Sequence, residues 1–172
     1  EVAMGKQIAA QQDRQFVFVN DPAVAGYIRD LGQRIWNNSG GGVIAPHFFV
    51  IQNKEINAFA IPGGNIYVQS GLIDTAEDEA ELAGVMAHEL GHVILRHGAR
   101  NISRQQGYEL VQQLVLGQET GEAAKLITGI IKSGVMNDYS RLDEQQADEI
   151  GVRTLDRMGY DPLALRTFFA KL

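Results

Sequence analysis

The feature that most constrains this chain is the stretch VMAHELGHVILRH, residues 85–97. Its apolar residues recur with the spacing of a helix that packs in a core. His88, Glu89 and His92 interrupt this apolar pattern, and polar groups buried without partners cost free energy. The fold must therefore satisfy these side chains separately or place a shared partner between them.

A metal ion is the partner that this spacing favours. Residues four apart on a helix differ by roughly 40° in azimuth, so His88 and His92 project together, one turn apart. Two imidazole nitrogens placed in this way can bind one zinc ion. Glu89 points to the side of the pair, where it could act as general base for a water molecule activated by the metal. Two ordinary core histidines remain the alternative interpretation.

A catalytic zinc site needs a third protein ligand. On a continuous helix His97 lies roughly 140° from His92, too far round to face the same metal, so we interpret it as a helix C-terminal residue. His47 is expected to be structural or exposed. The third ligand should therefore be a carboxylate, and Glu144 followed by Asp148 fits, because Asp148 could hold a ligand histidine in place. The rival carboxylates are Asp143, Glu149, Glu119 and Glu122, which are otherwise expected on solvated helix surfaces.

The spacing of apolar residues predicts helices at both ends of the chain and β-strands between them. Helices are expected at 2–13, 22–38, 75–98, 99–117, 120–135, 140–159 and from 161 onward. Thr75 and Gly98 are the expected caps of the helix that carries the histidines. The β-prone runs are 47–52, 57–61 and 65–70. These three runs predict a small antiparallel sheet, with a tight IPGGN turn between the last two.

Composition narrows the class of protein. A net charge of −6 without a dense basic patch argues against nucleic-acid binding. No apolar run is long enough to span a bilayer. The absence of cysteine excludes disulfides and thiolate metal sites. The chain begins at Glu1 without a signal-peptide pattern, so we expect that a targeting segment, and with it a possible membrane anchor, has been lost.

Three segments, in this order, resemble the signatures of one protease family. They are NAFAIPGGNIYVQSGLI (57–73), DEAELAGVMAHELGHVILRH (78–97) and YSRLDEQQADEIG (139–151). Together they resemble the HtpX/BepA-type zinc metallopeptidases of peptidase family M48. The resemblance implies an α+β fold with a mainly helical, gluzincin-like metallopeptidase core, in which a small antiparallel sheet of about three strands packs on the active-site helix. We expect residues 1–172 to form this single domain.

The resemblance also implies roles for particular residues. The family pattern Ser-Arg-x-x-Glu-x-x-Ala-Asp falls on residues 140–148, which implies that Glu144 is the third zinc ligand and that Asp148 supports a ligand histidine. Residues 99–135 would then be a helical insertion between the two zinc-ligand helices. In the membrane-embedded branches of the family this region spans the bilayer, whereas here it is amphipathic.

Substrate contacts are implied by the same resemblance. An edge strand containing Asn57, Ala58 and Phe59 would bind an extended peptide by adding it as a further strand, although an ordinary core strand is the alternative. The oxyanion of the reaction needs an additional donor. Tyr139 and Arg141 adjoin the ligand helix and are the candidates, and Arg141 could equally form a structural salt bridge.

The function expected from these features is that of a zinc-dependent endopeptidase. One zinc ion per chain would be bound by His88, His92 and Glu144, with Glu89 as the base, and the substrates would be extended or misfolded polypeptides. The soluble bacterial branch that the chain resembles implies a periplasmic enzyme or lipoprotein in envelope protein quality control. The alternative is a polypeptide-binding, chaperone-like module whose zinc site is latent or structural.

Overall fold

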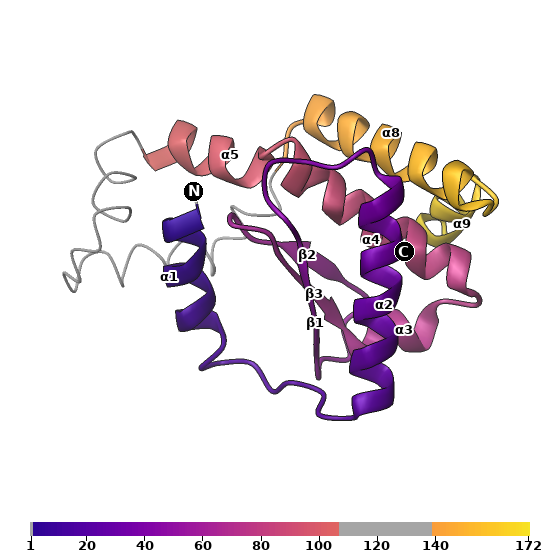
Figure 1. The fold of residues 1–172 in the computed structure, drawn as a ribbon, viewed down its shortest axis with the longest axis horizontal. Coiled ribbons are helices and arrows are strands. Elements are labelled where there is room, and N and C mark those ends of the chain that lie inside the picture. Colours follow the sequence, from indigo (N-terminus) through magenta and orange to yellow (C-terminus); the bar gives the residue numbers. More distant parts are fainter. Residues whose placement is uncertain (1, 107–138) are drawn as a thin grey trace.

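The computed structural model describes residues 2–106 and 139–172 (Figure 1). The helices are α1 (Val2–Gln12), α2 (Pro22–Asn38), α3 (Ser70–Thr75), α4 (Glu79–Ile94), α5 (His97–Gln106), α8 (Arg141–Met158) and α9 (Ala164–Phe169). The strands are β1 (His47–Ile51), β2 (Ala58–Ala60) and β3 (Asn65–Gln69). The expected α+β class, mainly helical with a small three-stranded sheet, is confirmed. The helix expected at 120–135 and most of the insertion expected at 99–135 lie outside the described residues, and the single domain stays a prediction.

The strand pairing corrects one expectation. The strand order is β1–β3–β2, with β2 antiparallel to β3 as the tight turn requires, but with β1 parallel to β3. The sheet is therefore mixed rather than antiparallel throughout. Burial explains the arrangement: Ile66, Tyr67 and Val68 of β3 are 0% exposed, and a strand that is apolar on both faces is most stable at the centre of a sheet. The hairpin consequently places β3 between β1 and β2.

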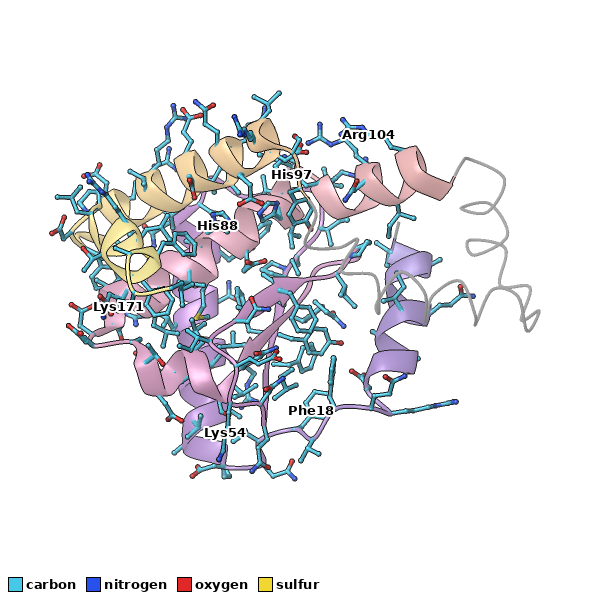
Figure 2. The ribbon with its side chains drawn as sticks, turned by 180° about the vertical axis from the view of Figure 1, so that it is seen from behind. Phe18, Lys54, His88, His97, Arg104 and Lys171 are labelled. Carbon is cyan, nitrogen blue, oxygen red and sulfur yellow. The ribbon has the colours of Figure 1, made fainter. Side chains whose placement is uncertain are left out.

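The two faces of the sheet pack against different partners. Ile66 and Val68 point into the main core, which α2, α4, α8 and α9 complete. Tyr67 points to the opposite face, where Ile8 of α1 and Ile102 of α5 form a second apolar cluster. Aromatic rings cover the same face, and Phe18, labelled in Figure 2, contacts Phe49 there. The sheet is thereby enclosed on both sides, as expected from the alternation of its side chains.

Helix α4 lies at the centre of the main core. It runs beneath α8 in Figure 1, with α2 and the sheet on its other sides. Most of its residues are buried, including His88 and His92. In the ranges 2–106 and 139–172, no helix combines the length and apolar character needed to cross a membrane.

The boundaries of α4 differ from those expected at Thr75 and Gly98. The helix begins after Asp78, whose side chain accepts the Glu81 N–H, while Thr75 ends α3. It ends at Ile94 because Arg96 adopts a φ of 58°, a left-handed conformation that breaks the helical hydrogen-bond ladder. A new helix, α5, then starts at His97. A left-handed arginine has no sequence signature comparable to glycine, which is why the break was predicted at Gly98 rather than at Arg96.

Glu79, in the first turn of α4, joins three parts of the chain. Its carboxylate accepts hydrogen bonds from the hydroxyl groups of Tyr27, at 2.7 Å, and Tyr160. It also forms an ion pair with Arg34 at 2.8 Å. The hydrogen bond from Tyr160 and then that from Arg34 are the main causes that lower the pKa of Glu79 to about 2. The start of α4 is thus anchored to α2 and to the segment after α8.

Glu79→Gln should reduce stability in a pH-dependent way. The folded-state pKa lies below the ordinary value of 4.5, so the charged form contributes stability above pH 4.5 that is lost as the pH falls toward about 2. Because 34% of the Glu79 side chain is exposed, water screens the pair and the expected loss at neutral pH is about 1 kcal/mol. Urea unfolding of both proteins across this pH range measures it. A loss that is the same at every pH would contradict the electrostatic origin, and Glu149→Gln, on the exposed face of α8, is the control.

Candidate metal centre

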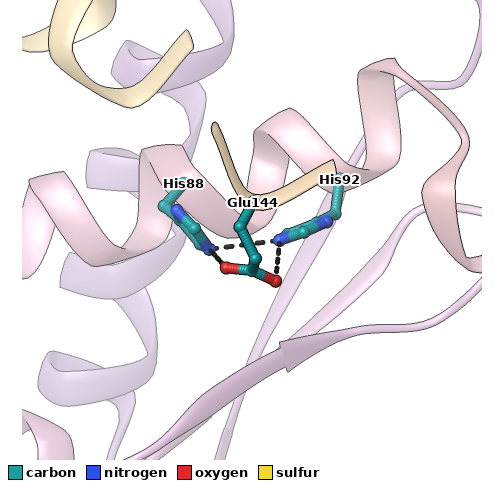
Figure 3. Close-up of side chains that lie close together, drawn as sticks. All are labelled: His88, His92 and Glu144. Carbon is teal, nitrogen blue, oxygen red and sulfur yellow. Dashed lines mark hydrogen bonds and ion pairs between the residues drawn. The ribbon is translucent and has the colours of Figure 1, made fainter. Parts of the chain in front are cut away.

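Three side chains from two helices converge on one point (Figure 3). His88 and His92 come from α4, and Glu144 comes from the first turn of α8. The two Nε2 atoms are 3.1 Å apart, and the Glu144 carboxylate oxygens lie 3.4 Å from His88 Nε2 and 3.7 Å from His92 Nε2. A tetrahedral zinc ion with ligands at about 2.0–2.1 Å separates its ligand atoms by roughly 3.3 Å. The donor set and its spacing therefore fit zinc.

Small residues allow α4 and α8 to approach closely enough for the three side chains to converge. A Cβ atom added at Gly91 would lie 2.9 Å from the Cα atom of Ala147, which is closer than real Cβ contacts. A Cβ atom at Gly151 would lie 3.4 Å from the backbone nitrogen of His88. The missing side chain of Gly91 thus makes room for α8, and Glu144 sits one turn before Ala147 on that helix.

His88 is the histidine of the pair that contacts Asp148. Its Nδ1 atom lies 2.8 Å from Oδ1 of Asp148, which leaves Nε2 facing His92 and Glu144. Burial opposes a charge on His88, but the hydrogen bonds with Asp148 and Glu144 outweigh it and raise the pKa of this imidazole. A carboxylate at Nδ1 fixes the ring orientation and makes the histidine a stronger metal ligand. The edge of the ring also contacts Phe169 of α9, a neighbour that no sequence pattern indicated.

His92 has a partner that was not expected. Its Nδ1 atom lies 2.9 Å from Nδ1 of His97, which is only 1% exposed. His97 is not among the metal-facing residues, but its interpretation as the cationic end of a helix is wrong: it begins α5, and burial lowers its pKa. His97 stays outside the metal-facing group, as its azimuth predicted, but the break at Arg96 brings its ring against that of His92, which was not expected. The residue pattern indicated a helix end at Gly98, two residues after Arg96.

Glu89 lies between the metal-facing group and the sheet. Its carboxylate accepts a hydrogen bond from the backbone N–H of Ala60 in β2. Burial, and secondarily the nearby charge of Glu144, raises the pKa of Glu89 to about 7, although His88 and the Ala60 N–H act in the opposite direction. A carboxyl group with a pKa near neutrality can both accept and return a proton, as a general base must.

The two oxyanion candidates lie in different surroundings. Tyr139 stacks on the ring of His92, with the ring centroids 3.9 Å apart and the planes 16° from parallel, and burial raises its pKa. Arg141 is the first residue of α8 and is exposed. Tyr139 therefore adjoins the metal-facing group directly.

Asn57, Ala58 and Phe59 lie at an edge of the sheet, as expected. Asn57 directly precedes β2, and Ala58 and Phe59 form its first two residues. The opposite edge, at β1, is covered, because the Val19 N–H donates to Val50 and the Gln52 N–H donates to Val17. Within the described residues, β2 is thus the edge that adjoins Glu89.

The rival carboxylates point elsewhere or lie outside the described residues. Asp143 accepts hydrogen bonds from Ser140 and lies 3.4 Å from His97 Nε2, and Glu149 pairs with Arg153 on the exposed face of α8. Glu119 and Glu122 belong to the part of the chain that the structure does not describe. His47 is exposed at the start of β1, in line with its expected role.

Comparison with known proteins identifies the family. The model for "Peptidase family M48" matches residues 22–172. The chain belongs to this family. It is 38% identical to the Beta-barrel assembly-enhancing protease of Escherichia coli (strain K12) over the whole of this chain and 37% of that protein. It is 36% identical to the Putative beta-barrel assembly-enhancing protease of Vibrio cholerae over 90% of this chain and 34% of that protein.

A mitochondrial protein is also similar to the chain. The Mitochondrial metalloendopeptidase OMA1 of Arabidopsis thaliana is 35% identical over 72% of this chain and 25% of that protein. The chain therefore spans at most 37% of the length of these three relatives. The family expected from the three sequence segments is confirmed, and a family of metallopeptidases agrees with the metal-facing group on α4 and α8.

Gly91→Ala should weaken metal binding by forcing α8 away from α4. Overpacking of this kind costs about 1–3 kcal/mol, which equals or exceeds the roughly 1 kcal/mol that alanine gains over glycine in a helix. Gly84→Ala is the matched control, because its Cβ would meet Leu165 of α9 at 3.2 Å rather than the helix that carries Glu144. Chelator competition measures zinc affinity, and urea unfolding measures stability. Equal zinc affinities in the two variants would contradict this role of the Gly91–Ala147 contact.

Proposed function

We propose that this chain is the catalytic part of a zinc-dependent endopeptidase that hydrolyses peptide bonds in extended or misfolded polypeptides. The observation that carries the proposal is the convergence of His88, His92 and Glu144, with Glu89 placed between this group and an edge strand. Two imidazoles and one carboxylate are a ligand set of catalytic zinc sites. Membership of a peptidase family supports the same reaction.

The three converging residues would hold one zinc ion. Zinc bound there supplies a Lewis acid that polarises a peptide carbonyl and acidifies water. The protein contributes the orientation of the ligands: Asp148 fixes the ring of His88, and Tyr139 stacks on the ring of His92. These contacts hold both imidazoles in place before substrate arrives, which avoids a cost of reorganisation during the reaction.

Glu89 would move the proton. It takes a proton from the attacking water and returns it to the leaving amine, so that a neutral amine rather than an amide anion departs. Its partly buried position next to Ala60 holds the carboxylate beside the substrate-binding edge. We propose Tyr139, rather than the exposed Arg141, as the nearer source of oxyanion stabilisation, since its ring adjoins His92.

Substrate would bind as a strand along β2. Asn57 O accepts from Gln69 N–H, and Ile61 N–H donates to Asn65 O, so alternate residues of this segment face β3. The peptide groups of Ala58 and Ala60 consequently point away from β3. The N–H of Ala60 donates to Glu89, so the N–H and C=O of Ala58 and the C=O of Ala60 are the groups that would face an incoming chain. Phe59 stacks on Tyr67 on the far face, where it fixes the strand. Main-chain pairing of this kind accepts many side chains, which suits unfolded substrates.

The resemblance and the relatives support a proposal for the cellular role. We propose that the enzyme acts in the periplasm, free or anchored as a lipoprotein, in the quality control of envelope proteins. The names of two relatives, each a beta-barrel assembly-enhancing protease, support substrates among envelope β-barrel proteins.

Glu89→Gln should retain zinc and lose peptide cleavage. Glutamine preserves the shape of the side chain but cannot accept the proton, and the loss of a general base reduces the rate by about 100- to 10,000-fold. Metal analysis and casein turnover, each with and without chelator, measure the two properties. Glu149→Gln is the control and should keep both.

Two results would count against these assignments. Full casein turnover by metal-replete Glu89→Gln protein would exclude Glu89 as the base. A wild-type protein that binds zinc, cleaves nothing and still holds unfolded polypeptide would instead indicate the chaperone-like module.

A further inference from the structure

The two nitrogens of His92 face different environments. Nε2 lies 3.1 Å from His88 Nε2 and 3.7 Å from Glu144, whereas Nδ1 lies 2.9 Å from His97 Nδ1. His92 and His97 are 2% and 1% exposed, so water does not compete for this contact. A metal-binding histidine usually donates its second ring N–H to a carboxylate, a backbone carbonyl or water. In His92 the partner at Nδ1 is instead a second imidazole.

The protonation pattern of this pair has one consistent solution. Only one proton fits between two ring nitrogens 2.9 Å apart. If His92 binds metal through Nε2, its proton is on Nδ1, and His97 Nδ1 accepts it. The proton of neutral His97 is then on Nε2, which lies 3.1 Å from Gln146 Oε1 and 3.4 Å from Asp143 Oδ1. Both of these oxygens are acceptors, so every contact is satisfied.

The opposite pattern is unfavourable. If His97 Nδ1–H donated to His92, the His92 proton would move to Nε2 and block the metal-facing nitrogen. The lone pair of His97 Nε2 would then face the carboxylate of Asp143, which can only accept hydrogen bonds when ionised. Ser140 and Arg100 help to keep Asp143 in place: its carboxylate accepts from Ser140 and lies 3.7 Å from Arg100. The surroundings of His97 therefore select the tautomer of His92 that can bind a metal.

We propose that His97 is a positioning residue of the metal centre, which accepts the Nδ1–H of His92 and donates through Nε2–H to Gln146, with the Asp143 carboxylate 3.4 Å from the same nitrogen. These two residues flank Glu144 on α8, so the chain of hydrogen bonds joins a ligand on α4 to the turn that carries the third ligand. Figure 2 shows His88 and His97 beneath α8, where each contacts a residue of that helix. The inference rests on the proposed zinc site.

Two substitutions separate hydrogen bonding from packing. His97→Leu fills similar space but leaves the His92 N–H buried without an acceptor. His97→Asn places an amide oxygen near the position of Nδ1 and retains the acceptor. We expect His97→Leu to weaken zinc binding by about 10- to 100-fold, and His97→Asn to bind zinc more tightly than His97→Leu. Competition with a chromophoric chelator measures both affinities, and the exposed His47→Leu is the control that should bind zinc as the wild type does.

Two further measurements report on the site itself. The d–d absorption bands of the cobalt-substituted protein should shift in His97→Leu and return toward wild type in His97→Asn, because they depend on the position of the ligand rings. Nitrogen-15 NMR of the zinc-loaded wild type should show protons on Nδ1 of His92 and Nε2 of His97. This last measurement needs no variant, and so it tests the proposal even if His97→Leu does not fold.

The outcomes distinguish this inference from the proposed function. Wild-type protein that binds no zinc would overturn the proposed function. Wild-type protein that binds zinc, together with unchanged affinity in His97→Leu, would overturn the role of His97 alone. The leucine and asparagine variants could instead lose zinc affinity equally, with matching losses in the unfolding free energy of the metal-free proteins. That result would show that His97 acts through packing and not by positioning His92. A proton on Nδ1 of His97 would also overturn the proposal.

Discussion

The close contact between α4 and α8 is the constraint on which the rest of the structure depends. Neither helix holds all three metal-facing side chains, because α4 supplies two histidines and α8 supplies Glu144. Their approach is set where Gly91 meets Ala147, with no room for another methyl group. The side chain of Glu144 is too short to compensate for a change in the distance between α4 and α8. Such a change would therefore move its carboxylate away from the two imidazoles.

The same contact resolves the burial of polar side chains in α4. Each of the two metal-facing histidines has one nitrogen toward the other histidine and the second nitrogen toward a hydrogen-bond partner. For His88 the partner is Asp148 of α8, and for His92 it is His97, which in turn reaches α8 through Gln146. The polar groups of α4 that would be costly without partners are thus paired, His88 directly with α8 and His92 with His97 of α5.

The order of the strands in the sheet places one edge strand beside the metal-facing group. Because β3 is buried on both faces, it occupies the centre and leaves β2 at an edge. The Ala60 N–H of that edge reaches Glu89, so the proposed base and the proposed substrate-binding strand adjoin each other. Local patterns predicted the β2–β3 hairpin from its turn, but not the parallel pairing of β1, which depends on contacts distant in sequence.

Interactions between residues close in sequence explain which features the sequence by itself determined. The spacing of His88 and His92 follows from helix geometry, and Ser140 and Gly159 cap α8 as their backbone chemistry requires. The likeness of residues 140–148 to a family pattern pointed to Glu144 and Asp148. Only the tertiary structure decided the partner of His92, because a left-handed Arg96 ends one helix and begins another. Arginine does not favour that backbone conformation, so local propensity did not indicate the contact between His97 and His92.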